Sequence, residues 1–264
     1  RFKDPAARTF PSPGPGALAG AAAQSNYLAI VRLFADALIA AGRDRYGAEH
    51  SPLFAAALDR AAMDLLSGEQ AGSIPGMREY DRSLGGANPM HDQNLYQVLY
   101  ALAAITGDAS YAREADAALA WFFSHCQSPK TGLMTWGEHI FWDFAFDRQG
   151  GYHQHHEFYR PWVLWDTCWA LAPGPSEAFA RGLWSHQIAD PETGRFSRHA
   201  RWSDHGVETG AEFPRHGGFY ILTWAHAYKR TRNPEFLKAI RTVLEMFRAF
   251  RDSRASRSYL SMAV

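Results

Sequence analysis

The apolar positions of this chain recur with a helical period and divide the predicted helices into two kinds. Segments at about 92–106, 157–172 and 215–229 are apolar on nearly every side, which indicates helices that are buried all round. Segments at 110–126 and 235–250 have one charged face and one apolar face, as helices with one solvent-exposed side do. The order along the chain is therefore an inner helix, a short turn, an outer helix and a long loop.

The N-terminal region predicts a less regular beginning. Residues 1–20 are rich in proline and glycine, which favours an irregular arm. Two further helices are expected, over 24–41 and 53–66, from their apolar spacing. We expect residues 21–264 to form one domain.

Internal repeats favour one particular arrangement of these helices. The segment from Thr106 aligns with the segment from Thr231 at an offset of 125 residues, and residues 129–132 align with 191–194 at about half that offset. A helical hairpin repeated with this period, with inner and outer helices alternating, predicts an all-α fold of the α/α toroid type. About eight helices are expected here, fewer than closed toroids use. The segment 251–264 resembles the start of another pair, so we expect a ring that is incomplete at its C-terminal side.

Composition excludes several classes of function. Lys+Arg and Asp+Glu both number 27, so the chain lacks the basic excess typical of nucleic-acid-binding proteins. It has no run of 18 apolar residues, and no membrane partner is expected. Two cysteines do not make a disulfide framework and are predicted to be buried thiols.

The long loops carry the residues suited to chemistry. In a ring of this kind the loops at about 68–91, 128–156 and 189–216 emerge at one end, and they contain eight of the twelve histidines. The inner helices also point their N-termini to that end, and helix N-termini favour anions. Aromatic rings, imidazoles and cations together predict a cleft for an acidic sugar.

Four segments carry a resemblance to a known group of enzymes. They are HSPLF (50–54), SPKTGLMTWGEH (128–139), HEFYRPW (156–162) and AEFPRHGGFY (211–220). Together they resemble bacterial toroid polysaccharide lyases of the polyuronate type, which act on alginate, polymannuronate or glucuronan. The resemblance implies β-elimination on an acidic polysaccharide without a cofactor, in the periplasm or outside the cell.

β-Elimination needs a neutralised uronate carboxylate, a base at C5 and an acid at O4. The resemblance implies an asparagine and a histidine as carboxylate neutralisers, and Asn88 and His139 match best. Arg215 is expected to be the activating cation and Tyr220 the base and acid, because a nearby positive charge lowers a phenol pKa. The residues expected to bind substrate are Trp136, Glu138, His91, His156, Tyr159, Arg160, Glu212 and His216.

The sequence leaves other functions open. Histidines crowded at His153, His155 and His156 suit loop packing better than a single ion, so we expect chemistry without a metal. A glycoside hydrolase on the same fold would need two carboxylates roughly 5–10 Å apart, and the candidates for these are Glu138, Asp143, Glu157, Glu208 and Glu212. A sugar epimerase and a non-catalytic glycan-binding protein also remain possible.

Overall fold

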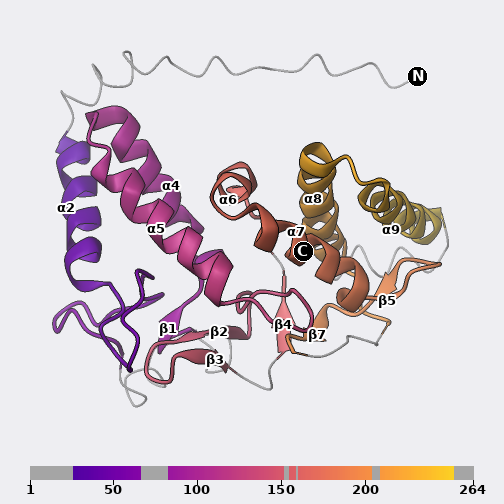
Figure 1. Cartoon of the computed structure of the whole chain (residues 1–264), viewed down its shortest axis with the longest axis horizontal. Helices are drawn as coiled ribbons and strands as arrows, with labels where there is room; N and C mark the ends of the chain where they lie inside the picture. The colour runs from indigo at the N-terminus through magenta and orange to yellow at the C-terminus, as the bar shows by residue number, and fades with distance from the viewer. Residues whose placement is uncertain (1–25, 67–82, 152–154, 159, 204–208, 253–264) are drawn as a thin grey trace.

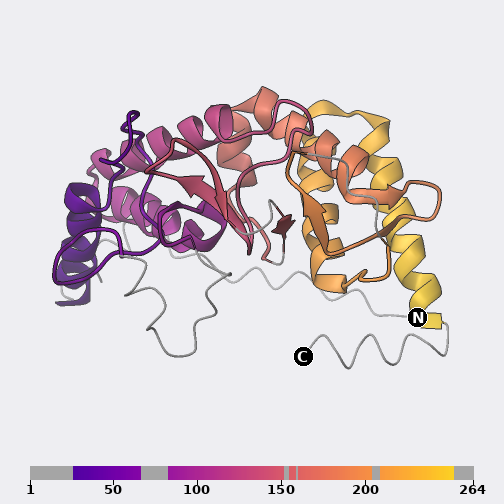
Figure 2. The same cartoon turned by 90° about the horizontal axis from the view of Figure 1, so that it is seen from below.

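A computed structural model describes residues 26–66, 83–151, 155–158, 160–203 and 209–252 of the 264-residue chain. These residues form helices joined by loops that contain short strands. Figure 2 shows the helices following one another around an arc from α2 to α9. The helices are α2 (Asn26–Ala41), α4 (Pro89–Thr106), α5 (Ser110–His125), α6 (Trp165–Leu171), α7 (Pro173–Gly182) with a π-helical turn (Leu183–Gln187), α8 (Pro214–Thr231) and α9 (Pro234–Asp252). In the described part of the chain, no helix has the length and apolarity needed to cross a membrane.

The pairs α4–α5 and α8–α9 confirm the repeat predicted from the sequence. α4 and α8 begin and end 125 residues apart, and each is followed by a residue in the left-handed region, Gly107 with φ 75° and Arg232 with φ 57°. Thr106 and Thr231 each donate a side-chain hydrogen bond to the carbonyl four residues earlier. The same turn chemistry therefore ends both inner helices.

The middle pair departs from the prediction. The inner helix expected over 157–172 is reduced to α6, which begins at Trp165, and β4 (His155–Glu157) occupies the beginning of the expected range. Pro161 lacks an N–H and disfavours a helical conformation at the residue before it, which explains the late start. Phe158 and Trp162 are fully buried without being helical, and that burial is why the segment is apolar on every side.

The helix predicted over 53–66 is wrong. Phe54 is buried and forms an isolated β-bridge with Arg43, which lies just after α2. The Asp59 carboxylate accepts hydrogen bonds from the backbone N–H groups of Ala61 and Ala62. A side chain that binds nearby N–H groups in this way offers the backbone an alternative to the helix.

The strands lie along one side of the helices, at the lower edge of Figure 1. β1 (Gly86–Ala87), β2 (Ile140–Asp143) and β3 (Arg148–Gly151) form an antiparallel sheet in that order. β4 pairs with β7 (His199–Arg201), and β5 (Ile188–Asp190) pairs with β6 (Arg195–Phe196). The long loops that carry the predicted site residues thus share one side of the molecule.

An aromatic core lies between α5, α6 and α7 and the loop before β2. Trp136 is fully buried there, with ring centroids 4.9 Å from Trp162 and 5.4 Å from Phe179. A buried aromatic side chain removes about 150–250 Å² from water, so this ring is a major source of stability. Trp136 was expected to stack on a sugar, and the core placement excludes that role. Both cysteines are buried free thiols, as expected.

Candidate active site

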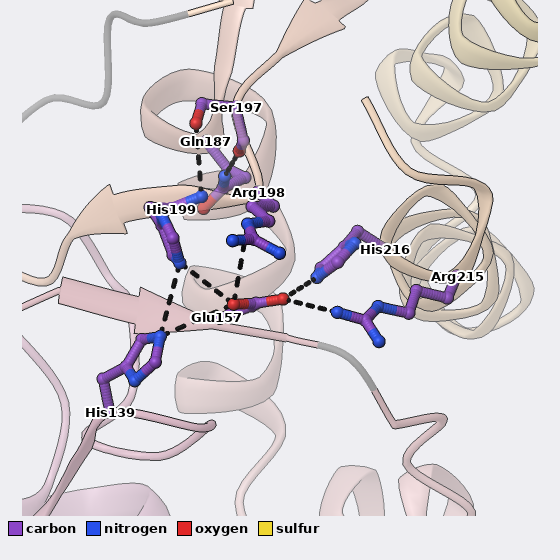
Figure 3. Close-up of polar contacts among 8 residues, drawn as sticks. All are labelled: His139, Glu157, Gln187, Ser197, Arg198, His199, Arg215 and His216. Carbon is purple, nitrogen blue, oxygen red and sulfur yellow. Dashed lines mark hydrogen bonds and ion pairs between the residues drawn. The ribbon is translucent and has the colours of Figure 1, made fainter. Parts of the chain in front are cut away.

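Figure 3 shows Glu157 at the centre of a cluster of charged and imidazole side chains. It is the last residue of β4, and its partner across the strand pair is His199 of β7. The Glu157 side chain is 2% exposed. A carboxylate buried to this extent needs charged or hydrogen-bonding partners to remain ionised.

Each oxygen of this carboxylate has its own partners. Oε2 lies 3.0 Å from Nε2 of His199, 3.5 Å from Nε2 of His139 and 3.9 Å from Nε of Arg198. Oε1 lies 2.8 Å from Nε2 of His216 and 2.9 Å from Nη2 of Arg215. Five residues from three separate segments therefore converge on one buried carboxylate, and we name these residues with Glu157 the Glu157 cluster.

The contacts determine the protonation states in the cluster. Burial alone raises the pKa of Glu157, but hydrogen bonds from His139, His199 and His216 outweigh it and hold that pKa well below its usual range. Burial lowers the pKa of His216, although the neighbouring carboxylate opposes the shift. At neutral pH Glu157 is thus ionised, while His216 is uncharged and donates its Nε2–H.

Arg215 and His216 both lie in the first turn of α8, and both contact Glu157. Pro214 occupies the first turn of α8, where its missing N–H has no helical partner to lose. Gly217 packs directly against the ring of Phe247, so any side chain at this position would collide with α9. The close packing of the two helices fixes the position from which Arg215 and His216 reach Glu157.

Asn88 fixes the loop that carries His139. It is fully buried, and its Nδ2 lies 2.6 Å from the carbonyl oxygen of Gly137 and 3.2 Å from that of Ile140. The same loop is tied to β4, because the N–H of Glu138 donates to the carbonyl of Glu157 at 3.0 Å. Asn88 therefore binds backbone carbonyls, whereas we expected it to face a substrate carboxylate.

A glycine is required where this loop meets β4. Gly137 has φ 109°, and a Cβ there would lie 2.7 Å from the carbonyl oxygen of Glu157. Neither the conformation nor the space allows a larger residue. His139 approaches Glu157 because its loop backbone can come this close to the strand.

The cluster contains a donor set suited to a metal ion. Among the described residues, His139, Glu157 and His199 each offer one ligand atom, and these atoms all lie within 4.8 Å of one another. Two imidazoles and a carboxylate are donors that divalent transition metals bind. Contacts from Arg215 and His216 to the other carboxylate oxygen would orient it, as outer-shell partners do. The expectation of chemistry without a metal rested only on the histidines at 153–156. Of these, His156 is buried and stacks on Phe158.

Among the described residues, Tyr220 makes no hydrogen bond to the Glu157 cluster, although the charge of Glu157 acts on its phenol. Its side chain is fully buried, and burial raises the pKa of its phenol well above the usual value. Residues five apart on a helix are separated by about 140° around the axis, so Tyr220 does not share the half-exposed side of Arg215. A phenol held neutral in the core is unsuited to be a base, and the geometry does not support our expectation.

The other expected binding residues are dispersed. Glu212 is buried and paired with Arg195, and so it is unavailable to a sugar. His91 is half-buried in the first turn of α4, and Arg160 is exposed. Tyr159 lies outside the described residues. Of the expected site residues, the structure brings His139, Arg215 and His216 together, with Glu138 beside them through its backbone.

Two central residues were not singled out by the sequence. Glu157 was noted only as one of several carboxylates, and His199 only as one of the loop histidines. The signal that unites them is the antiparallel pairing of β4 with β7, across 42 positions of chain. Three-residue strands have no periodicity long enough to be recognised in a sequence.

A comparison with known families agrees with this site. A family model described as periplasmic pectate lyase matches residues 77–216, more than half of the chain. The match contains the whole Glu157 cluster and ends on His216, and it gives no support to an alginate or glucuronan type of lyase. Its description agrees with the periplasmic or extracellular location expected from the sequence. The chain therefore belongs to the periplasmic pectate lyase family, a family of carbon–oxygen lyases that act on uronic-acid polysaccharides.

Proposed function

We propose that this protein cleaves pectate, the polymer named in the family's description and a polygalacturonate, by β-elimination at the Glu157 cluster. The observation that supports the proposal is the convergence of two arginines and three histidines on one buried carboxylate. Such a concentration of cationic and hydrogen-bonding groups suits a polymer that carries one carboxylate on every sugar.

The chemistry of the reaction explains the need for these groups. Removal of the C5 proton sends charge into the neighbouring carboxylate, which becomes enolate-like. Preorganised positive groups stabilise that charge more than they stabilise the ground state, and so they accelerate the reaction. Arg198 has a partly exposed side chain and is the cation available to a uronate.

We assign the action at C5 to Arg215. The Nε2 atoms of His139, His199 and His216 all face the Glu157 carboxylate. Whether they hold a proton or a cation, these atoms cannot also take the C5 proton. The Arg215 side chain is 50% exposed, and so it reaches both Glu157 and an approaching sugar. The base then lies on the first turn of α8, five residues before the tyrosine that we expected.

The cluster would also hold a divalent cation through His139, Glu157 and His199. A bound cation would supply positive charge to the uronate carboxylate, as a Lewis acid does. The proposal departs from our expectation of chemistry without a metal, and chelation tests it directly.

A hydrolase is less compatible with the cluster. A glycosidase needs one carboxylic acid whose pKa is raised so that it can protonate the leaving oxygen. The pKa of Glu157 is shifted in the opposite direction by its imidazole partners. The central carboxylate is thus ionised at neutral pH and acts through its charge.

We also propose that the arc of helices belongs to an α/α toroid. The equal spacing of α4–α5 and α8–α9 supports the proposal, as does the placement of the long loops on one side.

One assay separates these functions. β-Elimination leaves a double bond in the product, so incubation with polygalacturonate should produce new ultraviolet absorbance. Alginate and glucuronan, assayed in parallel, should give much less. New reducing ends without absorbance would indicate a hydrolase, and no change with any of the polymers would refute lyase activity.

A further inference from the structure

The β2–β3 hairpin forms one wall of a cavity of about 640 Å³ that the proposed chemistry does not use. Its size lies within the range of about 300–1,000 Å³ that ligand sites occupy. The lining mixes aromatic, polar and charged side chains, among them Trp142, Phe146, Arg148, Gln149 and Trp202.

The cavity is joined to the Glu157 cluster by the strands themselves. Gly151, on the cavity wall, pairs with Ile140, which directly follows His139. On the other side Trp202 follows β7, the strand that carries His199. His139 directly precedes β2 and His199 lies in β7, and residues next to these positions line the cavity. One polymer chain can therefore contact both the Glu157 cluster and the cavity.

One aromatic ring of the cavity is held in place by a hydrogen bond, and another is exposed to solvent. Trp202 donates from Nε1 to the carbonyl of Leu133 at 2.8 Å, which holds its ring in place. Phe146 is 66% exposed, although a large apolar side chain in water gains nothing for stability. The flat apolar faces of such rings suit the apolar faces of sugars, and an exposed ring at a cavity is typical of a binding surface.

Arg148 supplies the positive charge for a carboxylate. Its guanidinium lies 5.1 Å from the centre of the Phe146 ring, so a cation and an aromatic face adjoin. Arginine binds carboxylates through a planar pair of N–H donors. A sugar ring against Phe146 would place its carboxylate beside this group.

The two aspartates of the lining have structural partners. Asp143 accepts hydrogen bonds from the N–H groups of Ala145 and Phe146 at the hairpin turn. Asp147 accepts from the N–H groups of Ala48 and Glu49 and so ties a separate loop to the hairpin. Hydrogen bonds to backbone N–H groups stabilise these negative charges within the protein, whereas Arg148 is exposed.

We propose that this cavity is a binding subsite for galacturonate units of the polymer that lie several sugars away from the cleaved bond. The inference rests on the proposed polyuronate lyase function and adds that the enzyme recognises an extended chain. Phe146 and Trp202 contact sugar faces there, and Arg148 pairs with a carboxylate.

The subsite predicts a dependence on chain length. Binding energy from remote sugars contributes to the reaction only when the substrate is long enough to reach the subsite. The double variant Phe146→Ala/Arg148→Ala should lose about tenfold in kcat/KM on long polygalacturonate and less than about twofold on trigalacturonate. A matched control, Arg241→Ala/Leu244→Ala, removes the same kinds of exposed side chain from α9 and should leave both values unchanged.

The test separates the subsite from the proposed function. Ultraviolet activity of the wild type on either substrate tests the lyase itself. Equal losses on long and short substrates, or no loss on either, would overturn the subsite while leaving the lyase intact. If the wild type is inactive on both, retardation in gels containing polygalacturonate decides: a subsite requires weaker retardation of the double variant than of the control, and equal retardation refutes it.

Discussion

Nη2 of Arg215 lies 2.9 Å from Oε1 of Glu157, and this contact joins the first turn of α8 to the end of β4. Glu157 thereby connects the arginine proposed to act on the substrate with the imidazoles of His139 and His199 on its other oxygen. Because the residues of the cluster share one carboxylate, the effects of substitutions within the cluster on activity and stability should not be additive.

Replacement of Arg215 tests the proposed catalytic step. Arg215→Ala and Arg215→Lys should each reduce kcat by roughly 10²–10⁴, because an interaction made mainly in the transition state is lost. Lysine retains the charge but not the planar pair of donors, so it should not restore activity. Arg241→Ala, on the exposed face of α9, is the matched control.

The pH profile of the wild type identifies the base. A histidine acting as the base would give a rising limb near its ordinary pKa of about 6.5. We expect activity to continue rising into the alkaline range, as an arginine base requires. A plateau above pH 7.5 that disappears in His199→Ala would instead transfer the role to His199.

Tyr220→Phe should leave kcat close to the wild-type value. The phenol is fully buried, and its oxygen has no hydrogen-bond partner within the described structure, so its removal eliminates a buried unsatisfied group. The melting temperature should therefore be unchanged or slightly higher. A loss of more than about tenfold in kcat with an unchanged melting temperature would restore Tyr220 as a catalytic candidate.

The sequence predicted the parts of the fold that depend on local chemistry. Thr106 and Thr231 end their helices with the same hydrogen bond, and the repeated residues made the α4–α5 and α8–α9 pairs recognisable. Residues 157–172 were misassigned because a buried irregular segment is as apolar as a buried helix. Apolar periodicity cannot distinguish the two over so short a range.

The site was predicted only in part, for a physical reason. His139, Arg215 and His216 were predicted because imidazole and guanidinium groups in long loops are suited to acid–base chemistry and to carboxylate binding. Their common partner is buried by a strand pairing between distant segments, and only tertiary structure brings Glu157 to His199.

Asn88→Ala should destabilise the protein and reduce activity through His139. The substitution leaves the carbonyls of Gly137 and Ile140 without their buried donor, at a cost of about 2–4 kcal/mol. Asn88→Asp keeps the shape of the side chain but replaces the N–H donors by acceptors, so it should be no more stable than Asn88→Ala. Denaturant unfolding measures the loss, and a stability within about 0.5 kcal/mol of the wild type would refute this role for Asn88.

Asp92→Asn should stabilise the protein at alkaline pH. Burial raises the pKa of Asp92 to about 8, and its Oδ2 has no hydrogen-bond partner within the described structure. Between its unfolded pKa of about 3.9 and pH 8 the unfolded chain releases this proton and the folded protein keeps it, so stability falls as pH rises. Asparagine has no ionisable proton at this position, so Asp92→Asn removes this pH dependence of the stability.

The expected gain for Asp92→Asn is about 1–3 kcal/mol at pH 8, and it should diminish toward zero near pH 4. Thermal unfolding of both proteins across this range measures it. A difference that does not change with pH would show that the native carboxyl group does not keep its proton.

Chelation followed by metal addition distinguishes the two interpretations of the Glu157 cluster. His139, Glu157 and His199 offer ligand atoms close enough for one divalent cation, and two imidazoles with a carboxylate favour the late first-row metals. Dialysis against a chelator should therefore abolish most activity, and one such ion should restore it. His199→Ala should need a higher concentration of that ion, whereas His125→Ala on the exposed side of α5 should behave as the wild type does. Activity that survives chelation would support our expectation of metal-free chemistry and would leave neutralisation of the substrate to Arg198.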